Sequence, residues 1–325
     1  MMSVPVVETR GLVKRYGEHL AVAGIDLAIG PGEIFGLVGP NGAGKTTTMK
    51  ILATLLAPSA GEALVTGIPV DADPIEVRRR IGYMPDFYGV YDDLRVWEYL
   101  DFFARCYGIA PARRATMIGE LLEIVGLADK RDSYVETLSR GMRQRLCLAH
   151  TLVHDPALLI LDEPASGLDP RARVEMREIL RELRLMGKTI LVSSHILPEL
   201  GEMCTGVAII DQGRVLRSGS IDEIERSLRA TALLRIDILG DEAAVTAAGE
   251  WLGTDARVGD VLPAQGHDGS ARLEVAFDGT DEDQATLLRD MIAAGHRVVG
   301  FAQATSDLEE IFLKVTGQVD EERAA

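Results

Sequence analysis

The chain has 325 residues, of which 47% are hydrophobic and 26% are charged. This length suits two domains, and this balance supports a sizeable core, which excludes a chain that is disordered throughout. The net charge is −16, from 34 basic and 50 acidic side chains, and argues against nucleic-acid binding through a basic surface. Three scattered cysteines exclude a disulfide scaffold and argue against a structural zinc site.

No apolar run approaches the roughly 20 residues that a membrane-spanning helix needs. The longest runs, such as 157–161 and 207–210, have the length of strands. The first residues lack the basic and apolar pattern of a secretion signal. We therefore expect a cytoplasmic or peripheral protein, whose connection to a membrane would require a partner.

The elements expected in the first 230 residues alternate between strands and helices. Short β-rich segments fill 6–38, a glycine-rich loop follows, and 45–56 has the length and apolar spacing of a helix. The region 86–155 is expected to be helical, with helices over 91–107 and 112–125. Buried strands return at 157–161 and 189–192, on either side of a charged helix over 170–186. This alternation predicts a parallel sheet with helical crossovers.

The composition changes near residue 230. Residues 231–325 carry 7 basic and 19 acidic side chains, whereas residues 1–230 carry 27 and 31. The pattern then restarts, with strands expected at 231–239, 272–277 and 296–302, helices at 242–251, 282–294 and 307–315, and room for another strand within 253–270. This order predicts a small α/β domain of the ferredoxin-like βαββαβ type.

Residues 39–46 read Gly-Pro-Asn-Gly-Ala-Gly-Lys-Thr and fit the phosphate-loop pattern GxxxxGK[ST] at every position. Glycines let successive backbone N–H groups point at phosphate oxygens, and the following helix adds its positive N-terminal end. Lys45 is expected to reach the outer phosphates, and the Thr46 hydroxyl is expected to bind Mg²⁺. The motif predicts a nucleotide site.

A pair of carboxylates follows the apolar run 157–161. Asp162, at the tip of the expected strand, is a candidate for holding the Mg²⁺ shell, and Glu163 is a candidate for polarising an attacking water. Taken alone, the pattern also fits a strand followed by a solvated acidic turn. The phosphate loop upstream favours the catalytic pair.

With these motifs in this order, the chain resembles the ATP-binding cassette family, the nucleotide-hydrolysing subunits of ABC transporters. The resemblance covers about residues 5–225 and implies a P-loop ATPase fold, in which a mixed sheet carries a helical subdomain at about 86–155. We place this cassette at 5–228, a small accessory or regulatory α/β domain at 231–317 and a tail at 318–325.

The resemblance also implies roles for individual residues. Tyr16 would stack on adenine, and His195 would join Glu163 and Lys45 in catalysis by contacting the γ-phosphate. Ser139, Arg140 and Gly141 of the signature motif would cover ATP bound to a second cassette, and Asp169 would communicate across that interface. The phosphate loop that holds the cassette's own ATP would consist of Gly39, Pro40, Asn41, Gly42, Ala43, Gly44, Lys45, Thr46 and Thr47.

The sequence departs from the family pattern in two motifs. Asp86 follows Ile-Gly-Tyr-Met-Pro where the family has a glutamine that faces Mg²⁺. Asp86 could still offer an oxygen to the metal, but it adds negative charge beside the phosphates. The signature reads LSRGM where the family has LSGGQ, so that Arg140 is either a surface charge, which we favour, or an added phosphate contact.

Residues 306–317 resemble the appended domain of bacterial drug and polysaccharide exporter ATPases of the daunorubicin-resistance type. This resemblance implies a subunit that hydrolyses ATP with Mg²⁺, pairs with a second copy and powers a separately encoded transmembrane permease from the inner face of the membrane. The alternatives are a soluble ABC ATPase acting on nucleic acid or ribosomes and a nucleotide-gated regulator. A single cassette without a long coiled-coil insertion argues against the first alternative, and Glu163 and His195 argue against the second.

Overall fold

The structure is a computed structural model that describes residues 4–87, 89, 91, 93–221, 223, 224, 232–265 and 271–303. Contacts between Cα atoms divide the chain into two compact units, with the division between residues 221 and 222. Among the described residues, the first unit has two sheets and the second has one, and each unit has its own hydrophobic core. Within the described residues, no helix combines the length and the hydrophobicity needed to cross a membrane.

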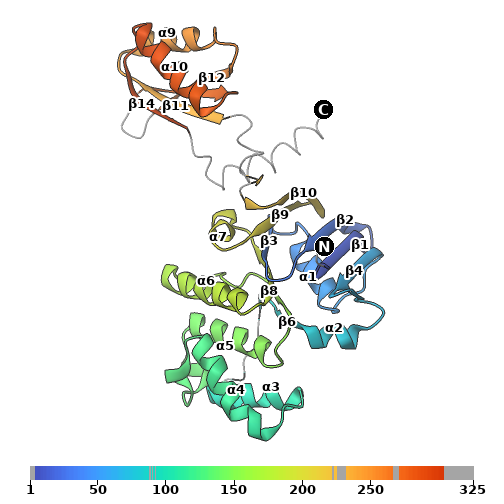
Figure 1. Cartoon of the computed structure of the whole chain (residues 1–325). Helices are drawn as coiled ribbons and strands as arrows, with labels where there is room; N and C mark the ends of the chain where they lie inside the picture. The colour runs from blue at the N-terminus through green and yellow to red at the C-terminus, as the bar shows by residue number, and fades with distance from the viewer. Residues whose placement is uncertain are drawn as a thin grey trace. The chain divides into compact units, whose positions relative to one another are not determined.

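The centre of the first unit is a six-stranded sheet in the order β10-β9-β3-β8-β7-β6 (Figure 1). Five neighbouring strands are parallel, and β10 is antiparallel to β9 at one edge. Every residue of β3, β7 and β8 is buried, as expected for strands covered on both faces. The strands are β3 (Ile34–Val38), β6 (Ile81–Met84), β7 (Leu158–Leu161), β8 (Thr189–Ser194), β9 (Gly206–Asp211) and β10 (Arg214–Gly219).

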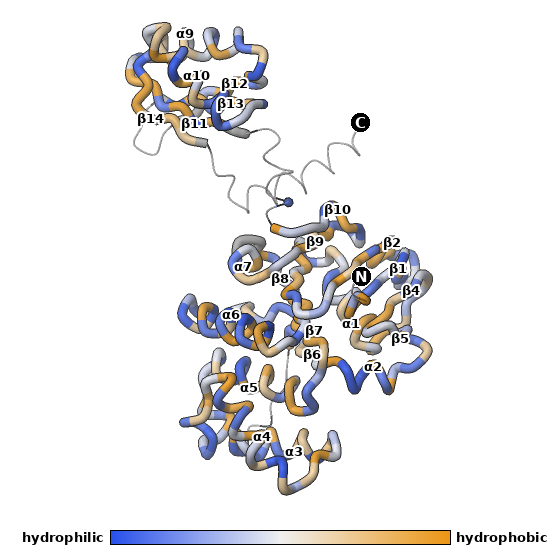
Figure 2. The backbone as a smooth tube through the Cα atoms, in the orientation of Figure 1, coloured by the Kyte–Doolittle hydropathy of each residue, from blue (hydrophilic) through white to orange (hydrophobic). Residues whose placement is uncertain are grey.

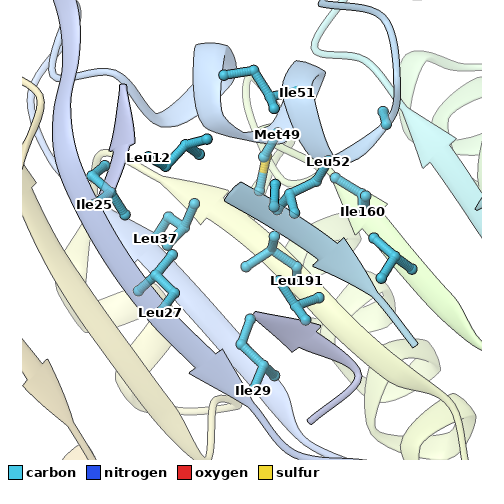
Figure 3. Packing of buried hydrophobic residues seen from close by; sticks show 14 of the residues in the cluster. Leu12, Ile25, Leu27, Ile29, Leu37, Met49, Ile51, Leu52, Ile160 and Leu191 are labelled. Carbon is cyan, nitrogen blue, oxygen red and sulfur yellow. The ribbon is translucent and has the colours of Figure 1, made fainter. Parts of the chain in front are cut away.

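A second, antiparallel sheet has the order β2-β1-β4-β5. It consists of β1 (Val7–Tyr16), β2 (His19–Ile29), β4 (Ala60–Val65) and β5 (Ile68–Pro69). Side chains of α1 (Lys45–Leu52) pack into the core of this unit, where Met49 and Leu52 belong to the same buried cluster as Leu37 of β3 (Figure 3). Because α1 begins at Lys45 in this core, the loop before it is fixed against the sheet.

Helix α1 ends four residues before the end we expect from the sequence. Thr54 adopts a φ of 60°, in the left-handed region, and its N–H donates to the carbonyl of Ile51, so that the chain turns away from the helix axis. Helix α2 (Pro74–Arg80) follows and leads directly into β6.

The helical part of the first unit contains three helices and two short 3₁₀ turns. The expected helix over 91–107 begins only at Val96, because the Glu98 carboxylate accepts from the Arg95 N–H and caps the helix there. The elements are α3 (Val96–Cys106), α4 (Pro111–Ile124), η1 (Ala128–Lys130), η2 (Val135–Thr137) and α5 (Arg140–Leu152).

Helices α6 (Pro170–Leu185) and α7 (Leu197–Gly201) complete the described helices of the first unit. Hydrophobic and hydrophilic residues alternate along α6 (Figure 2). Its buried side chains are Met176, Ile179, Leu180 and Leu183, which share one face at helical spacing. The crossover between β7 and β8 therefore supplies the helix that the sequence predicts, whereas α7, between β8 and β9, is not among the expected helices.

The second unit has the element order β11-α9-β12-β13-α10-β14 and an antiparallel sheet in the order β12-β13-β11-β14. This is the ferredoxin-like arrangement that we expect from the sequence, including the extra strand within 253–270. The elements are β11 (Ala232–Ile238), α9 (Glu242–Leu252), β12 (Val258–Gln265), β13 (Ala271–Phe277), α10 (Asp281–Ala293) and β14 (Val298–Gln303). The helix expected at 307–315 and the tail at 318–325 lie outside the described residues.

Candidate nucleotide-binding site

The phosphate-loop sequence forms a tight loop between β3 and α1. Gly44 has a φ of 105°, and a Cβ there would lie 2.5 Å from the carbonyl oxygen of Ala21, so only glycine fits. A Cβ on Gly39 would likewise collide with the carbonyl oxygen of Ile210. The loop therefore packs directly against the backbones of two strands. The loop and the N-terminus of α1 lie at the carboxyl end of β3, and a helix N-terminus in this place can receive an anion.

Lys45 places a positive charge at this end of the sheet. Its side chain is only 6% exposed, and its ammonium donates to the carbonyl of Gly39 at 2.5 Å and lies 3.7 Å from a carboxylate oxygen of Glu163. Burial lowers the pKa of Lys45 from its ordinary value, while Glu163 and Asp162 oppose that shift. A buried cation held by backbone carbonyls is available to a phosphate, which is a stronger acceptor.

Asp162 lies at the end of β7 and is 1% exposed. The hydroxyl of Thr46 donates to its Oδ1 at 3.1 Å, and the hydroxyl of Ser193, at the end of β8, donates to the same atom at 2.7 Å. A hydroxyl and a carboxylate in contact offer the hard oxygen ligands that Mg²⁺ takes. The donor set therefore fits the metal that the sequence predicts.

Glu163 stands next to this pair in a strained backbone conformation, with a φ of 50°. Its N–H donates to the hydroxyl of Ser193 at 2.9 Å, and its Oε2 lies 2.9 Å from Nδ1 of His195. Ser193 thus holds the carboxylate of Asp162 and the backbone of Glu163 in place. Sequence reasoning missed Ser193, although its position two residues before His195 at a strand end was a usable signal.

These side chains border a cavity of about 410 Å³ at the carboxyl ends of the parallel strands, the usual place for a ligand in such sheets. Tyr16 is 45% exposed and lines the cavity together with Asp86 and His195. His19 and Ser166 also line it, and neither was expected from the sequence. The phosphate-loop residues on its wall are Pro40, Asn41, Gly42, Ala43, Gly44, Lys45, Thr46 and Thr47.

Asp86 follows β6 and is exposed at this edge. Burial raises the pKa of the neighbouring Tyr83 to about 12, and the charges of Asp162 and Asp86 add to the rise. Tyr83 therefore stays protonated at neutral pH. The two carboxylates act on the same phenol from the β6 and β7 ends of the sheet.

The signature residues and Asp169 do not border this cavity. Ser139 caps α5 by accepting from the N–H of Met142 at 3.3 Å, and Asp169 caps α6 by accepting from the N–H of Ala172 at 2.9 Å. Together with Arg140 and Gly141 they line a separate cavity of about 350 Å³. Arg140 is exposed, and its Nη2 donates to the carbonyl of Ser166 at 3.2 Å.

A phosphate loop on a parallel sheet, with an acidic pair on the neighbouring strand, defines a P-loop nucleotide-binding protein. Residues 22–166 match the ABC transporter family. The chain is 36% identical to the Nod factor export ATP-binding protein I of Cupriavidus metallidurans, over 96% of this chain and 98% of that protein. It is 37% identical to the daunorubicin/doxorubicin resistance ATP-binding protein DrrA of Streptomyces peucetius, over 98% of this chain and 94% of that one.

Among solved structures, an ATP-binding subunit of an ABC transporter aligns with 31% identity and a TM-score of 0.62. The alignment covers 68% of this chain and 92% of that subunit. The chain belongs to the ATP-binding proteins of ABC transporters and is an ATPase subunit. The family resemblance and the fold class expected from the sequence are confirmed.

Proposed function

We propose that two copies of this chain pair head to tail around ATP and Mg²⁺ and drive a separate transmembrane permease. In this arrangement the phosphate loop of one copy binds ATP, and Ser139, Arg140 and Gly141 of the other copy cover it. Closure on ATP and opening after hydrolysis would do mechanical work on the permease from the inner face of the membrane. The names of the relatives support export as the direction of transport.

The contact of Glu163 with both Lys45 and His195 beside the cavity carries this proposal. A carboxylate 2.9 Å from a histidine and 3.7 Å from a buried lysine can accept the proton of an attacking water while the lysine holds the phosphates. His195, with a half-exposed side chain, would orient Glu163 and contact the γ-phosphate. Asp162 and Thr46 would hold Mg²⁺, which screens the phosphate charge when it is bound.

Asp86 is a third carboxylate at this site. It lines the same cavity, and its oxygen is a suitable Mg²⁺ ligand, but a third carboxylate raises the negative charge that a nucleotide must meet. Tyr16 would stack on adenine through the exposed face of its ring. The ammonium of Lys14 lies 5.3 Å from the centre of that ring. This cation–π contact supports the stacking role, because it holds the Tyr16 ring in place.

The position of the signature residues supports the pairing. Ser139 and Arg140 are exposed and line a cavity separate from that of Lys45, which fits a role toward a nucleotide held by another chain. A closed pair related by a two-fold axis would contain two such shared sites.

Mixing two inactive variants tests this pairing. Lys45→Ala inactivates the phosphate loop, and Ser139→Arg blocks the signature surface, so each variant alone should lose hydrolysis. A mixed pair keeps one site made of an intact loop and an intact signature. An equimolar mixture should therefore recover about a quarter of the wild-type turnover. A mixture that stays as inactive as its components would contradict the head-to-tail pairing.

A further inference from the structure

Arg140 occupies the position at which the family signature has glycine, and its side chain lies across the loop that follows the catalytic carboxylates. Its guanidinium donates to the carbonyl of Ser166 and covers Gly167. Gly167 has a φ of 66°, and a Cβ there would meet the guanidinium. The backbone conformation therefore favours glycine at 167, and a larger side chain there would displace the guanidinium.

The placement of Arg140 is electrostatically unfavourable for its own helix. It is the first residue of α5, whose first turn contains no acidic side chain, and the N-terminal end of a helix repels a cation. Arg140 is exposed, so burial does not hold it there. Its compensating interaction is the charged hydrogen bond to Ser166.

A second contact fixes the same loop from the buried side. Gln144, one helical turn after Arg140, is 3% exposed and donates to the carbonyl of Pro164 at 2.5 Å. At Gly141 an added Cβ would lie 3.1 Å from Ala172 and 3.7 Å from Leu168, so α5 and the start of α6 approach closely. Arg140 thus completes, on the exposed side, an attachment that Gln144 makes in the interior.

The loop that Arg140 holds borders both cavities. Ser166 lines the nucleotide cavity, whereas Gly167, Leu168 and Asp169 line the cavity that contains Ser139. We infer that Arg140 is a positioning residue that fixes residues 166–169 to the signature helix and thereby transmits nucleotide occupancy at Ser166 to the signature surface. This inference rests on the proposed pairing of two chains, because the surface of Ser139 acts on a partner.

Hydrogen exchange on the nucleotide-free full chain tests the physical link without any assay of activity. Arg140→Ala should speed amide exchange of residues 166–168 by about threefold or more, because their restraint is lost. Arg140→Lys should give an intermediate rate, since an ammonium can donate to Ser166 but cannot lie flat over Gly167. Arg113→Ala, which removes an exposed cation from the first turn of α4, should leave these amides unchanged. Unchanged exchange in Arg140→Ala would overturn the inference.

Steady-state hydrolysis then tests the consequence for function. Arg140→Ala should lower kcat and bring the Hill coefficient for ATP toward one, while the Kd for ATP of the nucleotide-free chain stays at the wild-type value. A raised KM for ATP with an unchanged Hill coefficient would instead mean that Arg140 acts only by covering the partner's ATP, and would overturn the positioning role. If the mixture of Lys45→Ala and Ser139→Arg also fails to recover activity, the pairing fails, and the exchange rates still decide the link to residues 166–168.

Discussion

The two units of the chain arrange their charged side chains in opposite ways. In the first unit, Lys45 and Asp162 are almost fully buried around a cavity, and backbone carbonyls and hydroxyls hold them. In the second unit, Arg235 faces Glu274 and Arg272 faces Asp237 across neighbouring strands of the sheet. These pairs are partly exposed and lie directly opposite one another.

The difference separates charges that need a ligand from charges that support a fold. Buried charges without a full set of partners cost free energy, and a protein keeps them where a ligand repays that cost. Cross-strand pairs of opposite charge satisfy each other and add a little to sheet stability. The first unit therefore contains the chemistry, and the second unit should tolerate changes that leave ATP hydrolysis intact.

The largest expected effect comes from removing the buried cation of the first unit. Lys45→Ala should lower ATP turnover by roughly a thousandfold, because a preorganised donor to the transferred phosphate is lost. Arg235→Ala, in the second unit, is the matched control and should keep wild-type turnover. The comparison fails if the two variants lose similar fractions of activity in a phosphate-release assay.

The core of the second unit offers the next largest effect. Ile236 is fully buried in its core, so Ile236→Ala should destabilise that unit by about 2–4 kcal/mol. The loss should shift one unfolding transition in denaturant while the ATP affinity of the chain stays unchanged. Leu262→Ala, at a side chain that is 59% exposed, is the control and should change neither transition. A loss of ATP binding in Ile236→Ala would show that the units depend on each other.

Acid should weaken the first unit through its helical part. Burial against Phe103, with a ring separation of 3.5 Å, lowers the pKa of His150 to about 4, and burial also lowers the pKa of His154. Because His150 binds a proton more tightly in the unfolded chain than in the folded one, protonation favours unfolding. The contribution of neutral His150 to the free energy of unfolding is complete above about pH 6.5 and is lost as the pH falls toward 4.

At pH 5 the protonation of His150 should lower the free energy of unfolding by about 2 kcal/mol relative to pH 7.5. Denaturant unfolding of wild type and His150→Phe at pH 7.5 and pH 5 measures it, and the variant should lose less stability than wild type between these values. Equal losses of unfolding free energy in the two proteins would show that His150 does not cause the acid sensitivity.

The smallest effect should come from a cross-strand pair. Glu274→Gln removes the charge that faces Arg235 at 3.3 Å, and the two side chains are 30% and 38% exposed. The cost should be only about 0.2–1 kcal/mol, which a double-mutant cycle with Arg235→Gln would resolve. A coupling energy above about 2 kcal/mol would mean that this pair is more than a sheet contact.

Much of the fold follows from local sequence patterns. The buried strands and the βαββαβ order of the second unit are visible as apolar alternation and turn residues. The start of α3 is not, because the cap formed by Arg95 and Glu98 competes with a helical pattern that continues back to Tyr91. The early end of α1 at Thr54 also depends on a local turn that periodicity does not report.

The candidate site also contains residues that the sequence predicts and residues that only the fold brings together. The phosphate loop and the pair Asp162 and Glu163 are contiguous motifs, so the sequence predicts them. Ser193 and Ser166 join the site only because the end of β8 and the loop after β7 meet at the carboxyl ends of the parallel strands. The hydrogen bond from Arg140 to Ser166 joins residues 26 positions apart, and no local sequence pattern predicts it.

The central claim is that Glu163 activates the attacking water in a cavity that binds ATP independently of it. Hydrolysis and bound ATP, measured on purified wild type and Glu163→Gln with Mg²⁺, test it most directly. The account predicts that the variant loses turnover by at least about a hundredfold and accumulates bound ATP, because the glutamine amide keeps the shape but cannot accept the proton. Wild-type turnover in Glu163→Gln would contradict it.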